Sequence, residues 1–164
     1  MSHEEDIKKE LENKFNYLKD KIVIKRPRRI FAEVDLANFY EVLDYGAKKM
    51  HFNRLATITG LDEGEKIGLI YHLSQDSGVL LNIHTAVLKT NPVIKTVLSY
   101  YPIAEIYERE LIDLLGVKVE GMPSGQRYPF PDNWPEGQYP LRKDWKADSL
   151  KDWKPEMNLE RGIF

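Results

Sequence analysis

The chain has 164 residues, of which 42% are hydrophobic and 30% are charged, a composition typical of one globular domain with a real core. Its 24 basic and 26 acidic residues are mixed along the sequence, so no strong field is present to attract nucleic acid or an anionic membrane. The absence of cysteine excludes disulfides, thiolate zinc sites and cysteine-ligated iron–sulfur clusters from this polypeptide.

An amphipathic helix is predicted at the start of the chain. Ser2 and Glu5 have the spacing of a capping box, in which each side chain bonds to the backbone of the other. Four apolar residues then recur at helical spacing on one face: Ile7, Leu11, Phe15 and Leu18. Residues 22–24 and 29–34 are rich in apolar and β-branched side chains and are predicted to be extended.

A second helix and a three-strand meander are predicted next. Asp35 is the expected N-cap of the helix, whose apolar face holds Leu36, Phe39, Tyr40, Leu43 and Ala47. Strands separated by polar turns are expected at residues 54–61, 66–74 and 79–88. Matching the apolar faces of the last two strands pairs Leu73 with Val79. His72 and His84 would then lie about 13 Å apart, too far to share a metal.

Two more helices complete the predicted domain. Asn91 followed by Pro92 resembles a helix start, which predicts a helix to Tyr101. Pro102 then breaks the chain before a helix over residues 104–115 that ends at Gly116. Residues 1–116 are therefore expected to form an α+β domain, with a mostly antiparallel sheet and helices packed on one face.

Residues 117–164 are predicted to form a long extended arm. They contain six of the nine prolines and all three tryptophans, with no sustained helical periodicity. Aromatic side chains are costly to leave in water, so the arm is expected to lie on something. The surface beneath it is either its own domain or a partner, and tryptophan is a favoured anchor at interfaces.

Few residues have the pattern of a chemical site. Glu105, Arg109 and Asp113 are spaced four apart on one predicted helix, so the arginine is expected to pair with both acids, which argues against a catalytic carboxylate pair. The basic run over residues 25–29 could contact nucleic acid, but an edge strand kept soluble by charge and proline is the favoured interpretation. No nucleotide-binding or serine-hydrolase motif is present.

Hydropathy gives no sign of a membrane span. No apolar run approaches the roughly 18 residues that a membrane-crossing helix needs, and the acidic start does not resemble a signal peptide. The chain is therefore expected to stay in the cytoplasm.

The segment from Tyr107 to Gly116 resembles the signature of the thirty-kilodalton subunit family of respiratory complex I. Further short matches follow in the family's order, at Val117–Val119, Gly121–Pro123, Gln126–Arg127, Pro131–Trp134 and Pro140–Trp145. Met122 stands where the complex I pattern usually has histidine. This departure, with the short chain and Trp134–Gly137, favours the branch of the family found in membrane-bound [NiFe] hydrogenases and related ferredoxin-linked complexes.

The resemblance implies a peripheral structural subunit with no active site, cofactor or metal of its own, on the cytoplasmic side of the membrane. Its partners would be the large hydrogenase-like catalytic subunit and the small iron–sulfur subunit. These would hold the iron–sulfur clusters and a [NiFe] centre for hydrogen evolution coupled to ion translocation. The alternative is the equivalent subunit of an NADH:quinone oxidoreductase or of a related quinone- or sulfur-reducing complex.

The residues expected to bind a partner come from the helix signature and the arm. They are Glu108, Arg109, Glu110, Asp113, Arg127, Trp134, Pro140, Leu141, Arg142, Lys143, Asp144 and Trp145.

Overall fold

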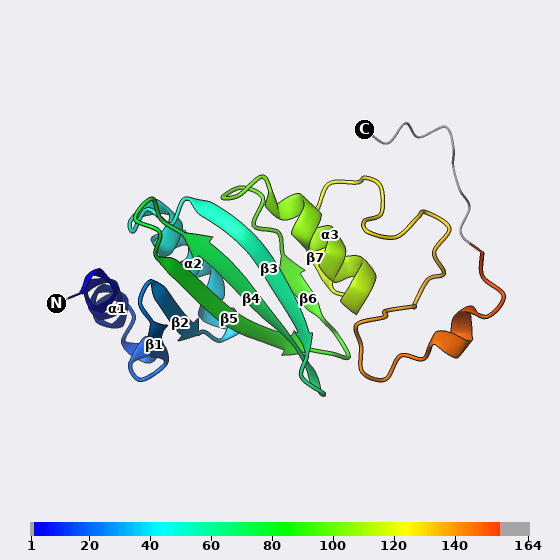
Figure 1. Ribbon diagram of the computed structural model, residues 1–164, viewed down its shortest axis with the longest axis horizontal. Coiled ribbons are helices and arrows are strands. Elements are labelled where there is room, and N and C mark those ends of the chain that lie inside the picture. Colours follow the sequence, from blue (N-terminus) through cyan, green and yellow to red (C-terminus); the bar gives the residue numbers. More distant parts are fainter. Residues whose placement is uncertain (1, 155–164) are drawn as a thin grey trace.

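The computed structural model describes residues 2–154, and the last ten residues of the predicted arm lie outside the described part (Figure 1). The elements are α1 (His3–Lys14), β1 (Ile22–Arg26), β2 (Arg29–Glu33), α2 (Leu36–Lys48), β3 (Arg54–Asp62), β4 (Lys66–Ser74), β5 (Leu80–Leu88), β6 (Val93–Lys95), α3 (Ala104–Leu115) and β7 (Lys118–Glu120). Short 3-10 turns, η1 and η2, occur at Asn16–Leu18 and Ala147–Leu150.

The main sheet has five strands in the order β1-β2-β5-β4-β3. The pairs β1–β2, β3–β4 and β4–β5 are antiparallel, whereas β2 and β5 run parallel. The last strand of the predicted meander, β5, therefore lies between β4 and β2. A second, two-stranded sheet pairs β6 with β7 in parallel. The α+β class is confirmed, but the sheet is mixed and not simply antiparallel.

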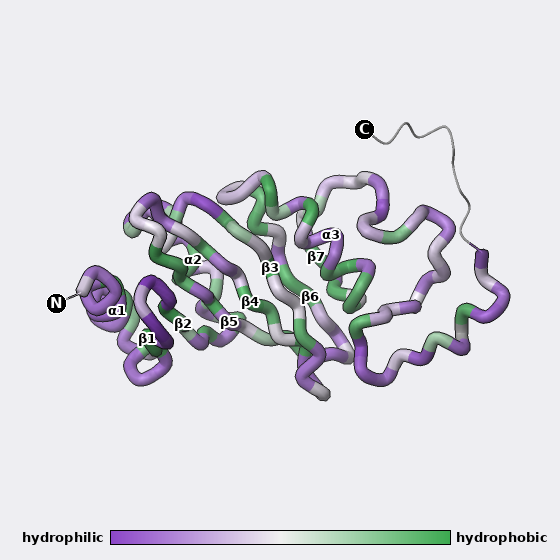
Figure 2. Tube along the Cα trace, viewed as in Figure 1, coloured by the Kyte–Doolittle hydropathy of each residue, from purple (hydrophilic) through white to green (hydrophobic). Residues whose placement is uncertain are grey.

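The core lies on one face of the five-stranded sheet. Alternate residues along β4 and β5 are fully buried there, among them Leu69, Tyr71 and Leu81. Apolar residues of α1, α2 and α3 belong to the same core, including Leu11, Phe39 and Leu111. The alternation of hydropathy along the strands is visible in Figure 2. Among the described residues, the three helices thus share one face of the sheet.

The N-terminal ends of the first two helices differ in how they are capped. Ser2 accepts a hydrogen bond from the backbone N–H of Glu5 (3.4 Å), so its predicted capping role is confirmed. Asp35 occupies the N-cap position of α2, but its side chain makes no capping hydrogen bond. Its carboxylate instead accepts from Lys21 Nζ (3.3 Å). The Asp35 carboxylate therefore binds the side chain of Lys21 instead of a backbone N–H of the helix.

The predicted helix over residues 91–101 is wrong. Residues Val93–Lys95 form β6, which pairs with β7, and the chain from there to Tyr101 is irregular. Asn91 and Pro92 suit a helix start, but Val93 and Ile94 are β-branched and a strand partner is available 25 residues further along the chain. Tertiary pairing outweighs the local capping signal here.

The predicted pairing of β4 with β5 is wrong by two residues. Leu73 pairs with Leu81, which places His72 opposite Asn82 and leaves the buried face unchanged, because side chains alternate with a period of two. His72 is bonded to Thr59 (2.9 Å) and Asn82 (2.6 Å).

Residues 2–154 contain neither a metal-binding cluster nor a membrane-spanning helix. No group of three or more histidine, aspartate or glutamate side chains is close enough to hold a metal ion. No helix in this part of the chain is both long and apolar enough to cross a membrane.

Candidate docking site at helix α3 and the C-terminal segment

Helix α3 carries the first group of predicted site residues and is held tightly against the sheet. Gly60 of β3 lies beneath it, where a Cβ atom would stand 2.3 Å from Leu115 Cδ1 and 2.6 Å from Leu111 Cδ2. The helix ends at Gly116, whose φ of 68° gives the left-handed cap that the sequence predicts. Residues 121–154, here called the C-terminal segment, then pass over the end of α3 (Figure 1).

Glu108 faces the inside of the domain. Its side chain is fully buried, and its carboxylate accepts from the Thr96 hydroxyl (2.6 Å) and from the Val97 N–H (2.8 Å). Burial raises the pKa of this carboxyl, and the two hydrogen bonds partly oppose that rise. Glu108 therefore fixes the loop after β6. The neighbouring Glu110 is partly exposed.

Arg109 joins α3 to the start of the C-terminal segment. Its guanidinium pairs with Glu105 (2.8 Å), as the four-residue spacing predicts. Its remaining donors go to the carbonyls of Pro123 (3.1 Å) and Gln126 (3.2 Å). The predicted pairing with Asp113 is wrong, because the C-terminal segment supplies nearer partners for both side chains.

Asp113 forms an ion pair with Arg127 of the C-terminal segment. The Asp113 side chain is only 3% exposed, and its Oδ1 lies 3.0 Å from both Nε and Nη2 of the arginine. The other oxygen accepts the N–H of Phe130 (3.3 Å), while Arg127 Nη1 donates to the carbonyl of Trp134 (2.7 Å). One carboxylate thus organises the segment from residue 127 to residue 134.

The tryptophans pack within the C-terminal segment. Trp134 is 8% exposed and stacks on Phe130, with ring centroids 4.0 Å apart, while Trp153 meets it edge-on at 4.8 Å. The indole N–H groups of Trp134 and Trp145 donate to the backbone and side-chain oxygens of Gln138, at 2.9 and 2.8 Å. The aromatic rings therefore form a small cluster of their own.

The Pro140–Trp145 motif is bound to the end of α3. The N–H of Leu141 donates to the carbonyl of Leu114 (3.1 Å), and Arg142 Nε donates to that of Leu115 (2.8 Å). These bonds satisfy carbonyls that a helix leaves free at its C-terminus. Arg142 also lies over the ring of Tyr139, at 4.6 Å from the centroid. Pro140 is half-buried, whereas the Leu141 side chain is 53% exposed.

A second ion cluster fixes the next residues of the motif. Asp62, at the end of β3, accepts from Lys89 Nζ (2.6 Å) and from the backbone N–H groups of Lys143 and Gly64 (both 2.8 Å). Lys89 also reaches Asp144 (3.0 Å). The hydrogen bond from Lys89 is the largest cause of the low pKa of both Asp62 and Asp144.

This cluster makes the attachment of the motif sensitive to acid. Because the pKa of Asp62 is lower in the folded chain than in the unfolded one, its contribution to stability is complete above the unfolded value of about 4 and is lost as the pH falls towards the folded value. We expect Asp62→Asn to be less stable at neutral pH and to lose less stability between about pH 5 and pH 2 than the wild type. Urea unfolding across this pH range tests this. Parallel pH profiles for the two chains would contradict it.

A cavity of about 590 Å³ lies between α3 and the C-terminal segment. Arg109, Arg127 and Lys118 line it together with Glu136 and Tyr139. Tyr128, also at its wall, is 45% exposed. The site therefore combines a fixed backbone with a few accessible side chains.

The structure brings together the predicted site residues of α3 and of the C-terminal segment, but it also uses most of their polar groups within the chain. Lys143 and Asp144 remain largely exposed, and Arg142 and Trp145 are half-buried. Sequence reasoning missed Asp62, Lys89, Gln138 and Tyr139, which hold the motif in place. The aromatic side chain of Tyr139 signals burial but not its partner, and Asp62 has no sequence signal, because it lies 81 residues before the backbone group that it binds.

Comparisons with known proteins agree on one family. The model of the family described as "Respiratory-chain NADH dehydrogenase, 30 Kd subunit" matches residues 32–151. A subunit of the F420H2 dehydrogenase of Methanosarcina mazei is 32% identical over 127 residues, which cover 76% of this chain and 80% of that protein.

Two further similarities involve membrane-bound complexes. The membrane-bound hydrogenase subunit beta of Pyrococcus furiosus is 37% identical over 90 residues, which make up 52% of each chain. Among solved structures, a chain of the membrane-bound sulfane sulfur reductase, an archaeal respiratory membrane complex, superposes with a TM-score of 0.76 at 26% identity. That superposition covers 96% of this chain and 95% of the other.

Proposed function

Because the chain belongs to the family of the 30 kDa subunit of respiratory-chain NADH dehydrogenase, we propose that it is a structural, non-catalytic subunit of a membrane-bound electron-transfer complex. The observation that carries this proposal is the near-complete superposition on a chain of an archaeal respiratory membrane complex. A match over 96% of the chain extends into the C-terminal segment, so nearly all of this sequence resembles a subunit of such a complex. The role is mechanical: the chain fixes the position of the redox subunits.

The proposed partner of the C-terminal segment is the large hydrogenase-like subunit, with the small iron–sulfur subunit as a second neighbour. The segment is held on α3 by Arg127 and Arg142, and on the end of β3 by the backbone of Lys143, so it is ordered before a partner arrives. A pre-ordered segment loses less conformational entropy on docking than a flexible one. Leu141 and Tyr128, both about half exposed, would supply apolar contact area.

We assign the complex to the hydrogenase type, in which electrons from ferredoxin reduce protons at a [NiFe] centre and the reaction drives ion translocation. The similarity to a membrane-bound hydrogenase subunit of Pyrococcus furiosus supports this choice. The second candidate is the equivalent subunit of a complex that reduces quinone or sulfur compounds. It is supported by the longer match to the Methanosarcina mazei dehydrogenase subunit and by the sulfur reductase fold.

We propose that all redox groups lie in the partner subunits and that the chain lies on the cytoplasmic side of the membrane. The first point is supported by composition: with no cysteine in 164 residues, the chain lacks the usual ligand of iron–sulfur clusters and of structural zinc. Metal analysis of the chain purified alone tests the proposal that it holds no redox metal. Stoichiometric iron or nickel would contradict it.

Assembly can be tested by isolating the chain from membranes of its native host under mild detergent. We expect the full-length chain to copurify with a large hydrogenase-like subunit and an iron–sulfur subunit. A chain cut after Glu120 keeps β7 and the rest of both sheets but lacks the C-terminal segment, and we expect it to copurify poorly.

Two measurements make this result interpretable. The melting curve of the shortened chain shows whether the domain still folds by itself. The identity of the copurified large subunit separates the hydrogenase type from the quinone or sulfur type. Copurification of the shortened chain at the wild-type yield would overturn the docking role of the segment, and purification of the full-length chain without any redox subunit would overturn the proposed function.

A further inference from the structure

The β1–β2 hairpin ends in a concentrated group of positive charge. Its tip comprises Lys25, Arg26, Pro27, Arg28 and Arg29, and is here called the basic tip. The rest of the chain has 20 basic residues against 26 acidic ones, so the charge is segregated. The tip is strongly hydrophilic in Figure 2 and lies at the end of the molecule opposite the C-terminal segment.

The cations of the basic tip are not neutralised within the described part of the chain. None of the ion pairs formed among residues 2–154 involves any of the four. Lys25, Arg26 and Arg28 are exposed, and Arg29 is half-buried. The four side chains are therefore free of ion pairs within residues 2–154 and can pair with another molecule.

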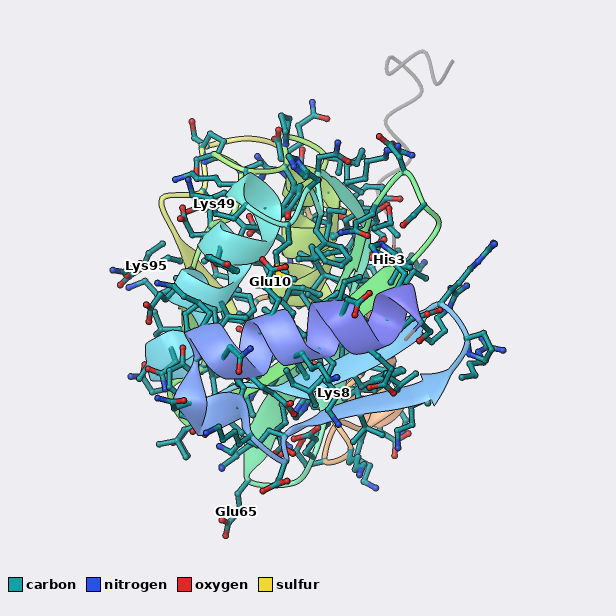
Figure 3. The ribbon with its side chains drawn as sticks, turned by 90° about the vertical axis from the view of Figure 1, so that its left-hand side faces the viewer. His3, Lys8, Glu10, Lys49, Glu65 and Lys95 are labelled. Carbon is teal, nitrogen blue, oxygen red and sulfur yellow. The ribbon has the colours of Figure 1, made fainter. Side chains whose placement is uncertain are left out.

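The backbone of the basic tip is fixed. Arg26 pairs with Arg29 across a two-residue turn formed by Pro27 and Arg28. The N–H of Arg28 donates to Glu4 (2.6 Å), and its carbonyl accepts from the N–H of Leu80 (2.9 Å). In Figure 3 the turn lies on the same side as His3 at the start of α1.

Arg28 occupies a backbone conformation that normally selects glycine or asparagine. Its φ is 61°, at the second central position of the turn. An arginine there costs conformational energy that a glycine would avoid. Charged side chains along the edge strand β1 are explained by protection against pairing with other chains. That role does not require an arginine with a strained backbone in the turn.

We propose that the basic tip is a docking point for an acidic protein surface. Two acidic side chains belong to its surroundings. The Glu4 carboxylate accepts from the Arg28 N–H, and Asp76, which pairs with Arg54 of β3, belongs to the β4–β5 turn, whose Gly78 lies beside the Arg28 side chain. A long polyanion such as duplex DNA, or a flat anionic membrane, would meet these acids as well as the cations. A compact acidic cluster on a protein would contact only the tip.

Contact through one hairpin tip buries little area, so the interaction is weak, salt-sensitive and quick to form. The probe is a fluorescein-labelled hexaglutamate peptide, and binding to the full chain is followed by fluorescence anisotropy at low salt, about 20 mM, and at about 200 mM. A 20-bp DNA duplex and vesicles containing phosphatidylserine are tested in parallel.

The decisive variant is Arg26→Gln with Arg28→Gly, which removes two charges and relieves the strained turn. We expect peptide affinity to fall about five- to tenfold while the melting temperature does not fall, because the glycine relieves the strained turn. The matched control, Lys49→Gln with Lys95→Gln, removes two exposed charges away from the tip (Figure 3) and should change affinity less than about twofold.

Three outcomes overturn the proposal. They are equal losses in the two variants, no salt-sensitive binding of the peptide at low salt, and tighter binding to the duplex or to the vesicles than to the peptide. The test does not depend on the proposed subunit role, because it uses the chain alone.

Discussion

Arg127→Met is expected to destabilise the chain by about 3 kcal/mol, because it leaves the buried carboxylate of Asp113 without its ion partner. Removing one member of a fully buried ion pair costs about 3–5 kcal/mol. The lower end applies here, since the Arg127 side chain is 27% exposed and that of Asp113 only 3%. The carbonyl of Trp134 also loses its donor. We therefore expect residues 123–139 to detach from α3.

Urea unfolding measures the loss, and amide hydrogen exchange shows whether it falls on residues 123–139. Two variants serve as controls. Lys21→Met breaks an ion pair with Asp35 whose side chains are 41% and 76% exposed, and should cost less than about 1 kcal/mol. Adding Asp113→Asn to Arg127→Met removes the unpaired charge and should restore part of the stability. Equal losses for Arg127→Met and Lys21→Met would show that the Asp113 pair contributes no more than a surface contact.

Gly116→Ala is expected to cost about 2–4 kcal/mol, through two effects that add. The residue has a φ of 68°, which an alanine adopts only with strain. A Cβ atom there would also lie 2.6 Å from the ring of Tyr139, so the ring and the motif behind it would have to move. The substitution should therefore loosen the Pro140–Trp145 motif as well as the end of α3.

Gly137→Ala separates the two effects. Gly137 has a φ of 74°, but no atom outside its immediate chain neighbours lies within 4 Å of a Cβ at that position. It should therefore cost only the strain, about 1–2 kcal/mol. Unfolding free energies of the two variants give the contribution of the Tyr139 contact by difference. If the two losses are the same, packing of Tyr139 on Gly116 contributes nothing to stability.

Helix α3 illustrates what local sequence can specify. Pro102 and Gly116 bound it on either side, and its observed span of Ala104–Leu115 is the predicted one. The Glu105–Arg109 pair follows from the same local geometry. Asp113 has the same spacing from Arg109, but its partner is Arg127, because a nearby donor from the C-terminal segment competes successfully with a neighbour on the helix.

The motifs that identify the family were readable without a structure, because they are sequences of residues in a fixed order. Their positions in space were not. The Pro140–Trp145 motif was predicted to bind a partner, and the fold ties Leu141 and Arg142 to the carbonyls that end α3. The role of the motif in partner binding stays a prediction, which now applies to those of its side chains that remain exposed.

The sequence by itself determined the α+β class, the buried faces of β4 and β5 and the ends of α3, because each depends on residues that are close together in the chain. Tertiary structure alone decided that β5 lies parallel to β2, that Val93–Lys95 is a strand and that Asp62 holds the backbone of Lys143. Each of these contacts joins segments that are distant in sequence. No pattern of neighbouring residues reveals that two such segments will pair.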